Sequence, residues 1–196
     1  YRGRPAQSPI ERMRQSAGEN FHYIVYHNEP GGVAEAEYDA NPRGLISHVY
    51  LGIAANSETL PPIVTDPLRS AGGWIDRLGA PIRLPDWLTE NDLNYIVSQF
   101  EKAGFRGGVN YYRNFHRNWE ITEHLTDAKI GIPTLFIAGE EDFVIGGATK
   151  EQLTVSMGRV VEDLRDVVLV PNTGHWVQQE APLETTAAML DFLNGL

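Results

Sequence analysis

The sequence lacks several features, and each absence narrows the class of protein. It has no cysteine, which excludes disulfides and thiol chemistry and fits a cytoplasmic protein. No run of about 18 apolar residues occurs, and the first residues have no apolar core, so we expect neither a membrane span nor a signal peptide. The 16 basic residues form no run against 26 acidic ones, which argues against nucleic acid or a membrane surface as partner. The chain also begins without a methionine.

Catalytic signatures are missing as well. The pattern G-x-S-x-G, or its variant with Asp, occurs nowhere, and neither does a His-Gly-rich oxyanion loop or HExxH. His116, Glu120 and His124 follow one another at helical spacing, but solvated helix faces often produce that spacing. We therefore expect no metal and no cofactor.

The residues that are present indicate an ordinary globular chain that divides near residue 126. Hydrophobic residues make up 42% of the 196 and charged residues 21%. The first part reads as helices and loops. Ser8 and Glu11 predict a capping box, Asn41 opens a second helix, and Thr89 begins a third that Gly104 ends. A long Pro/Gly-rich connection separates the second helix from the third.

The second part reads as strand, helix, strand, helix. The apolar runs 132–139 and 166–170 are typical of strands buried on both faces. Between them, 149–164 predicts a helix that starts with a Thr149–Gln152 capping box, and its expected buried side is Leu153, Val160, Val161 and Leu164. Pro182 marks the first turn of a final helix. The two strands should be parallel, with a right-handed crossover.

Two parallel strands do not form a stable sheet alone, because parallel sheets need more strands and helices on both faces. Residues 1–125 offer no convincing further strands. We therefore expect the back half of an α/β sheet protein, without its front half.

Two residues follow the predicted strands where such a sheet would bind a ligand. Asp142 lies just beyond the first strand and His175 just beyond the second. An Asp that accepts a hydrogen bond from a His fixes the tautomer of the imidazole. The unperturbed pKa of His is about 6.5, so such a His can act as a base near neutral pH. We expect the two side chains within hydrogen-bonding distance.

Five segments, in order, resemble the soluble epoxide hydrolases of the α/β-hydrolase fold. They are FHYIVYHNEPGGVAEAE, LPDWLTENDL, GVNYYRNFHRNWE, IAGEEDFV and TGHWVQQEAP. The resemblance runs from about Arg2 to Leu193. It implies a helical cap in residues 1–125, with an N-terminal connection, and the C-terminal part of the core in residues 126–196. The N-terminal half of that fold, with the nucleophilic Asp, would lie outside this sequence, on the same or a separate chain.

By this resemblance, Tyr23 and Tyr112 are the acids that hydrogen-bond the epoxide oxygen, and His175 with Asp142 hydrolyses the ester that forms on the missing Asp. Phe21, Tyr26 and Trp176 are expected to contact an apolar epoxide. The two tyrosine hydroxyls should converge, with Tyr111 turned away. From the residues alone, however, Tyr112, Phe115 and Trp119 form an ordinary core stripe, and Tyr26 is equally suited to packing.

Two alternatives stay open at this point. A dehalogenase of the same fold would also use an Asp nucleophile, although the tyrosine pair argues against it. A non-catalytic fragment could instead dock onto another chain, and a homo-oligomer is compatible with the sequence. We expect this chain alone to be inactive.

Overall fold

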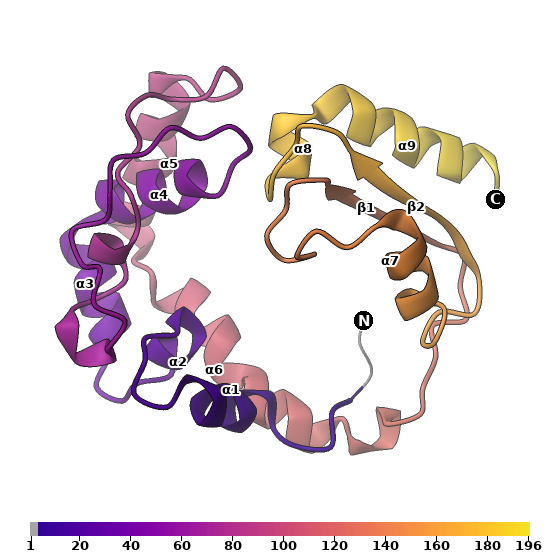
Figure 1. The fold of residues 1–196 in the computed structure, drawn as a ribbon, viewed down its shortest axis with the longest axis horizontal. Coiled ribbons are helices and arrows are strands. Elements are labelled where there is room, and N and C mark those ends of the chain that lie inside the picture. The colour runs from indigo at the N-terminus through magenta and orange to yellow at the C-terminus, as the bar shows by residue number, and fades with distance from the viewer. Residues whose placement is uncertain (1–3) are drawn as a thin grey trace. The chain divides into compact units, whose positions relative to one another are not determined.

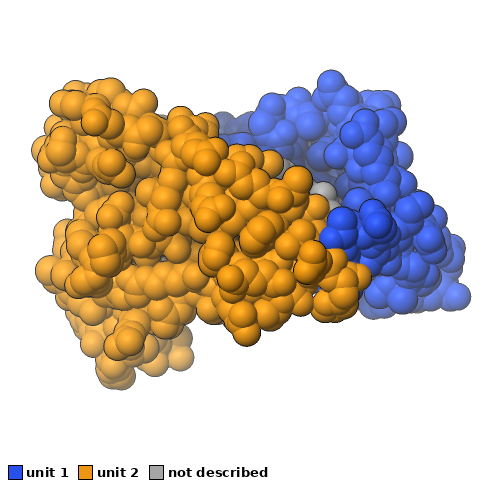
Figure 2. Space-filling model, turned by 90° about the horizontal axis from the view of Figure 1, so that it is seen from below, with its two compact units in different colours: residues 1–3, 53–57, 125–196 blue, residues 4–52, 58–124 orange. Residues whose placement is uncertain are grey.

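The computed structural model describes residues 4–196, and these form two compact units (Figure 2). The helical unit consists of residues 4–52 and 58–124, and the sheet unit of residues 53–57 and 125–196. The short segment 53–57 is separated in sequence from the rest of the sheet unit and falls within residues 1–125, the predicted cap.

The helical unit contains six α-helices within the described residues (Figure 1). They are α1 (Pro9–Ala17), α2 (Tyr23–His27), α3 (Val33–Ala40), α4 (Pro42–Gly52), α5 (Glu90–Ala103) and α6 (Arg106–Ile121). The connection from α4 to α5 is irregular apart from two single 3₁₀ turns, η1 (Arg69–Ala71) and η2 (Ile75–Arg77). A third turn, η3 (Glu123–Leu125), follows α6.

Side chains at the helix starts explain several of these boundaries. Thr89 and Asp92 form a complete capping box at α5, and the Asn41 side chain accepts a hydrogen bond from the Gly44 N–H at 3.0 Å. Gly104 ends α5 with φ +68°, a conformation that favours glycine. These predicted ends are confirmed.

The capping box predicted at Ser8 is wrong. Ser8 does precede α1, but its side chain makes no capping hydrogen bond. Its hydroxyl lies 2.9 Å from Nδ1 of His116 on α6 instead. Because Ser8 is fully buried, this bond across the unit satisfies a polar group that would otherwise be costly to bury.

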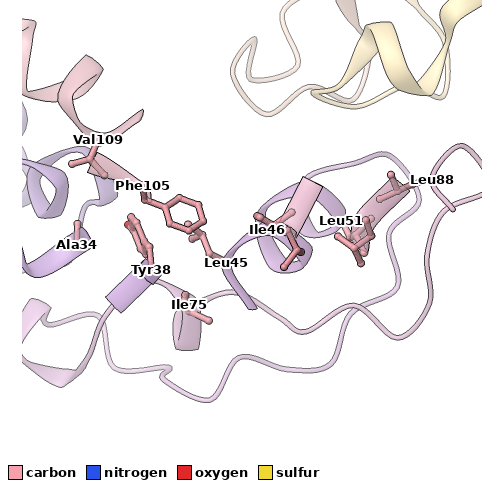
Figure 3. Packing of buried hydrophobic residues seen from close by; sticks show 11 residues of the cluster. Ala34, Tyr38, Leu45, Ile46, Leu51, Ile75, Leu88, Phe105 and Val109 are labelled. Carbon is pink, nitrogen blue, oxygen red and sulfur yellow. The ribbon is translucent and has the colours of Figure 1, made fainter. Parts of the chain in front are cut away.

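An apolar core joins α3, α4, α5 and the start of α6 (Figure 3). Tyr38 and Leu51, each 1% exposed, are its largest fully buried side chains, and the helical spacing of Leu93 and Val97 places both of them in it. A smaller cluster of Ile10, Ile24 and Val25 joins α1 and α2, and Tyr23, Tyr112 and Phe115 pack against it.

The sheet unit has a parallel pair of strands, β1 (Thr134–Gly139) and β2 (Leu164–Val170), within the described residues. Their helices are α7 (Lys150–Met157), α8 (Val177–Glu180) and α9 (Pro182–Asn194). In Figure 1, α7 and α9 lie on opposite sides of the pair. The expected parallel pairing is confirmed, with Ile137 opposite Val168 and Gly139 opposite Val170.

Two expectations for the sheet unit are wrong in detail. The helix from Thr149 does start with a capping box, but it ends at Met157; Val161 instead forms a parallel bridge with Ile130, and Leu164 begins β2. The strands are also not buried on both faces, since most of their residues keep some exposure.

Candidate functional site

In the sheet unit, the loops after the two strands bring His175 and Asp142 together. Nδ1 of His175 lies 3.0 Å from Oδ1 of Asp142, so the expected hydrogen bond is confirmed. The same carboxylate oxygen accepts the Val144 N–H at 2.8 Å, which fixes the Asp142 rotamer. Asp142 is buried, whereas the His175 side chain keeps about a third of its surface, 31%. A carboxylate that receives Nδ1–H leaves Nε2 as the ring atom that can take a proton.

Two aromatic rings lie beside His175. The Phe143 ring lies with its centroid 5.2 Å from the imidazole, and the Trp176 ring meets it edge-on at 4.9 Å. Trp176, predicted to contact substrate, therefore adjoins the His175 ring directly. Phe143 was not among the predicted residues, although its place directly after Asp142 could have suggested it.

In the helical unit, Tyr23 on α2 and Tyr112 on α6 lie together. Their ring centroids are 5.8 Å apart, edge to face at 81°. Tyr23 also stacks on Trp74, with the centroids 4.9 Å apart and the rings 12° from parallel. Both tyrosines are half-buried. Residues 89 positions apart in the sequence thus contribute to one aromatic cluster.

Hydrogen bonds between α2 and α6 explain this convergence. Nε of Arg113 donates to the carbonyl of His27 at 3.0 Å, and the Asn28 amide donates to the carbonyl of Tyr112 at 3.3 Å. The Arg113 guanidinium also forms a bidentate ion pair with Glu35 on α3. The end of α2 is therefore joined to α6 at the turn that carries Tyr112.

Burial shifts the acidity of both phenols in the same direction. It raises the pKa of Tyr23, with a smaller contribution from Tyr112, and it raises the pKa of Tyr112. Both hydroxyls therefore stay protonated at neutral pH and can donate hydrogen bonds.

Tyr111 is 80% exposed, so the prediction that it turns away from its neighbour's cluster is confirmed. Tyr26 packs against Phe21, with ring centroids 5.3 Å apart, and its hydroxyl lies 3.5 Å from the Val33 carbonyl. Arg77 lies over the other ring of this pair, 4.4 Å from the Phe21 centroid. Phe21 and Tyr26 line a cavity of about 420 Å³ together with His22, Val25 and Arg69, among others.

Sequence reasoning missed the centre of the tyrosine cluster. His27, which was not among the predicted site residues, is 3% exposed, and its ring contacts those of Tyr23, Tyr112 and Trp74. Nε2 of His27 lies 2.8 Å from the Tyr38 hydroxyl, whereas the buried Nδ1 has no hydrogen-bond partner among residues 4–196. The pKa of His27 is lowered to about 4, chiefly by burial. The positive charge of Arg113 also lowers the pKa, and the negative charge of Glu35 partly opposes both effects.

In the described part of the chain, no group of three or more His, Asp or Glu side chains could hold a metal ion. No described helix has the length and apolar character that crossing a membrane requires.

The parallel strand–helix–strand unit, with an Asp and a His after consecutive strands and a separate helical unit, defines part of an α/β-hydrolase fold. The solved structures that the chain resembles have this fold. Epoxide hydrolase A from Mycobacterium thermoresistibile superposes with a TM-score of 0.82 at 42% identity, over 99% of this chain and 59% of that one. An epoxide hydrolase from an endophytic Streptomyces gives 0.83 at 29% identity, over 100% and 58%.

Sequence relatives carry the same description. Epoxide hydrolase A of Mycobacterium tuberculosis is 38% identical over 191 residues, and Epoxide hydrolase 1 of Siraitia grosvenorii is 33% identical over 191 residues. Each match covers 96% of this chain but only 56% and 57% of the relative. No model of a known protein family matches the sequence. The chain is thus homologous to epoxide hydrolases of the α/β-hydrolase fold and spans somewhat over half of their length.

Proposed function

We propose that the protein to which this chain belongs hydrolyses epoxides to vicinal diols through an alkyl-enzyme ester. The observation that carries the proposal is the adjacent pair of half-buried tyrosines, Tyr23 and Tyr112, and burial raises the pKa of both phenols. A His–Asp pair serves many hydrolases, but two adjacent phenols suit a ring oxygen that becomes an alkoxide. The names of the relatives support the same reaction.

In the first step, a carboxylate attacks one epoxide carbon, and the bond from that carbon to the ring oxygen breaks. Tyr23 and Tyr112 donate hydrogen bonds to the ring oxygen, and one of them gives it a proton. The product is a hydroxyalkyl ester. The nucleophile comes from a part of the protein outside this sequence, which contains no matching G-x-D-x-G pattern.

In the second step, Nε2 of His175 takes a proton from water, and the resulting hydroxide attacks the ester carbonyl. Asp142 stabilises the imidazolium that forms. The ester bond breaks, the diol oxygen takes a proton from His175, and the proton of the regenerated carboxylic acid passes through water to the tyrosinate. The substrate we propose is a small apolar epoxide, with Phe21, Tyr26 and Trp176 as contacts.

The step assigned to His175 is tested by its replacement. In the intact protein, His175→Gln should still form the ester but hydrolyse it slowly, because the base is gone. An adduct of enzyme plus epoxide should then accumulate and be visible by intact-mass spectrometry with styrene oxide. Wild-type steady-state diol formation by this variant would show that another group activates the water.

The tyrosine pair is tested by single-turnover measurements of ring opening. Removal of one oxyanion donor typically raises the activation barrier by about 2.7–4 kcal/mol. Because a second donor remains, Tyr23→Phe or Tyr112→Phe alone should raise the barrier to ring opening by less than this. The double variant should raise it clearly more than either single change. Tyr111→Phe is the matched control, since this neighbour is exposed. Equal effects at Tyr111 and Tyr112 would contradict the assignment. Halide release from a haloalkane, without diol from the epoxide, would favour the dehalogenase alternative.

A further inference from the structure

Glu180, the last residue of α8, contacts the backbone on both sides of His175. One carboxylate oxygen, Oε2, accepts the Gly174 N–H at 2.8 Å, and the other, Oε1, accepts the Trp176 N–H at 2.9 Å. The N–H of His175 itself donates to the carbonyl of Ile53 at 3.4 Å. Three consecutive amides around the base are therefore held by groups outside the loop.

The same carboxylate reaches a third segment. Oε2 of Glu180 also accepts the Ala55 N–H at 2.9 Å. Glu180 therefore joins the loop that carries His175 to residues 53–57, which lie about 120 positions earlier in the sequence of the same unit. Charge-assisted hydrogen bonds of this kind are roughly twice as strong as neutral ones.

The packing around the loop leaves little room for movement. A Cβ on Gly174 would lie 2.5 Å from the Ala55 nitrogen, and a Cβ on Gly139 would lie 2.2 Å from the carbonyl oxygens of Thr173 and Gly174. The loop is thus packed between the end of β1 and the segment 53–57. Its own secondary structure is irregular, and Asn172 adopts a left-handed φ of +52°.

A structural role in α8 alone does not account for Glu180. The end of a helical turn presents free carbonyl groups, which disfavour a negative charge nearby. The carboxylate is turned back to the loop before the helix, where it accepts the N–H groups of Gly174 and Trp176, in addition to that of Ala55 in the segment 53–57. The Gly174 and Trp176 groups flank His175, whose ring must keep its place against Asp142 for Nε2 to stay available.

We propose that Glu180 is a positioning residue for His175. By fixing the peptide groups on either side, it holds the imidazole against Asp142 and so maintains the Nδ1–H tautomer. Its effect on turnover rests on the proposed function, because only ester hydrolysis needs His175 as a base. Its effect on the ring does not depend on any substrate.

The test uses two replacements in the intact protein, with a matched control. Glu180→Gln keeps one oxygen and so preserves part of the clamp, whereas Glu180→Ala removes all three bonds. Glu184→Gln, at an exposed position on α9, removes the same charge elsewhere. Thermal denaturation identifies any variant that is not folded at the assay temperature.

The first measurement is the ¹⁵N resonance pattern of the His175 ring. The wild type and Glu184→Gln should show one tautomer with the proton on Nδ1. Glu180→Gln should show a mixture, as should Glu180→Ala to a greater degree. An unchanged ring pattern in folded Glu180→Ala would overturn the proposal, whether or not the protein hydrolyses epoxides.

The second measurement separates the two chemical steps by rapid mixing. Ester hydrolysis should slow by about 10- to 100-fold in Glu180→Ala, as expected for a misplaced catalytic group, and by less in Glu180→Gln, while ring opening keeps its rate. Equal slowing of both steps would indicate a general loss of structure and overturn the positioning role. Failure of the wild type to form any ester would refute the proposed function, and the ring resonances would still decide on Glu180.

Discussion

At the scale of single residues, His27 gives the helical unit a pH dependence of its own. Its pKa is lowered to about 4, so between about pH 6.5 and pH 4 the unfolded chain binds a proton that the folded chain does not. The free energy of unfolding should therefore fall as the pH falls through this window, by up to about 1.4 kcal/mol per pH unit. Urea denaturation at several pH values measures this slope.

The slope should be smaller in the double variant His27→Phe with Tyr38→Phe. The double change removes the titrating ring and the hydroxyl that bonds it, so no buried partner is left behind. His124→Gln, at an exposed position, is the control and should keep the wild-type slope. A double variant with an unchanged slope would assign the pH dependence to another group.

Contacts between site residues could be predicted from the sequence where the order and direction of the strands determine them. Asp142 and His175 follow consecutive parallel strands, and such strands end at one edge, so their contact was predictable. The burial of His27 was not, because its neighbours Trp74 and Tyr112 come from distant segments. No local pattern records such contacts. The roles of Tyr23 and Tyr112 in catalysis stay predictions.

At the scale of elements, α5 begins with a complete capping box, whereas α1 has no side-chain cap. The contribution of the α5 cap to stability can be measured. Thr89→Ala removes the capping box of α5 and should lower the stability of the helical unit by about 1 kcal/mol. Ser98→Ala, which removes an exposed hydroxyl from the same helix, should change it by less. Chemical denaturation followed by circular dichroism compares them. An equal loss in both variants would show that the α5 cap adds nothing specific.

The helix starts at Thr89 and Thr149 were predictable because a capping box is local and has its own sequence signature. The end of α7 at Met157 was not, since the apolar residues after it serve a bridge and a strand rather than a helix face. The spacing of apolar residues indicates which side chains are buried, but it does not show whether they belong to a helix or to a strand. The absence of a side-chain cap at Ser8 was also not predictable from local sequence, because the Ser8 hydroxyl bonds His116, which lies 108 positions away.

At the scale of the whole molecule, the sheet unit exposes much apolar surface. Leu183, Met189, Leu190 and Leu193 of α9 are each more than half exposed, as is Ile132 before β1. Surfaces of this kind usually mark a face that another part of a protein covers. The relatives are longer than this chain, which agrees with that reading.

We therefore expect residues 1–196 alone to form no diol from styrene oxide, because the proposed nucleophile lies outside them. The intact protein, assayed at the same concentration, should form diol. Product analysis by chromatography decides between the two, and circular dichroism checks that the lone chain is folded. Diol formation by the folded lone chain would place the nucleophile within these 196 residues.

The assignment of residues 53–57 to the sheet unit also has a consequence for protein engineering. A chimera that exchanges residues 4–124 as one block would replace the segment 53–57 that contacts the loop of His175 with one from another protein. The hydrogen bonds that Ile53 and Ala55 form around that loop use backbone atoms, so they depend on the length and path of the segment rather than on these two side chains. Crossover points after residues 52, 57 and 124 keep the original segment with its own unit, and the exchange is then made as two cassettes.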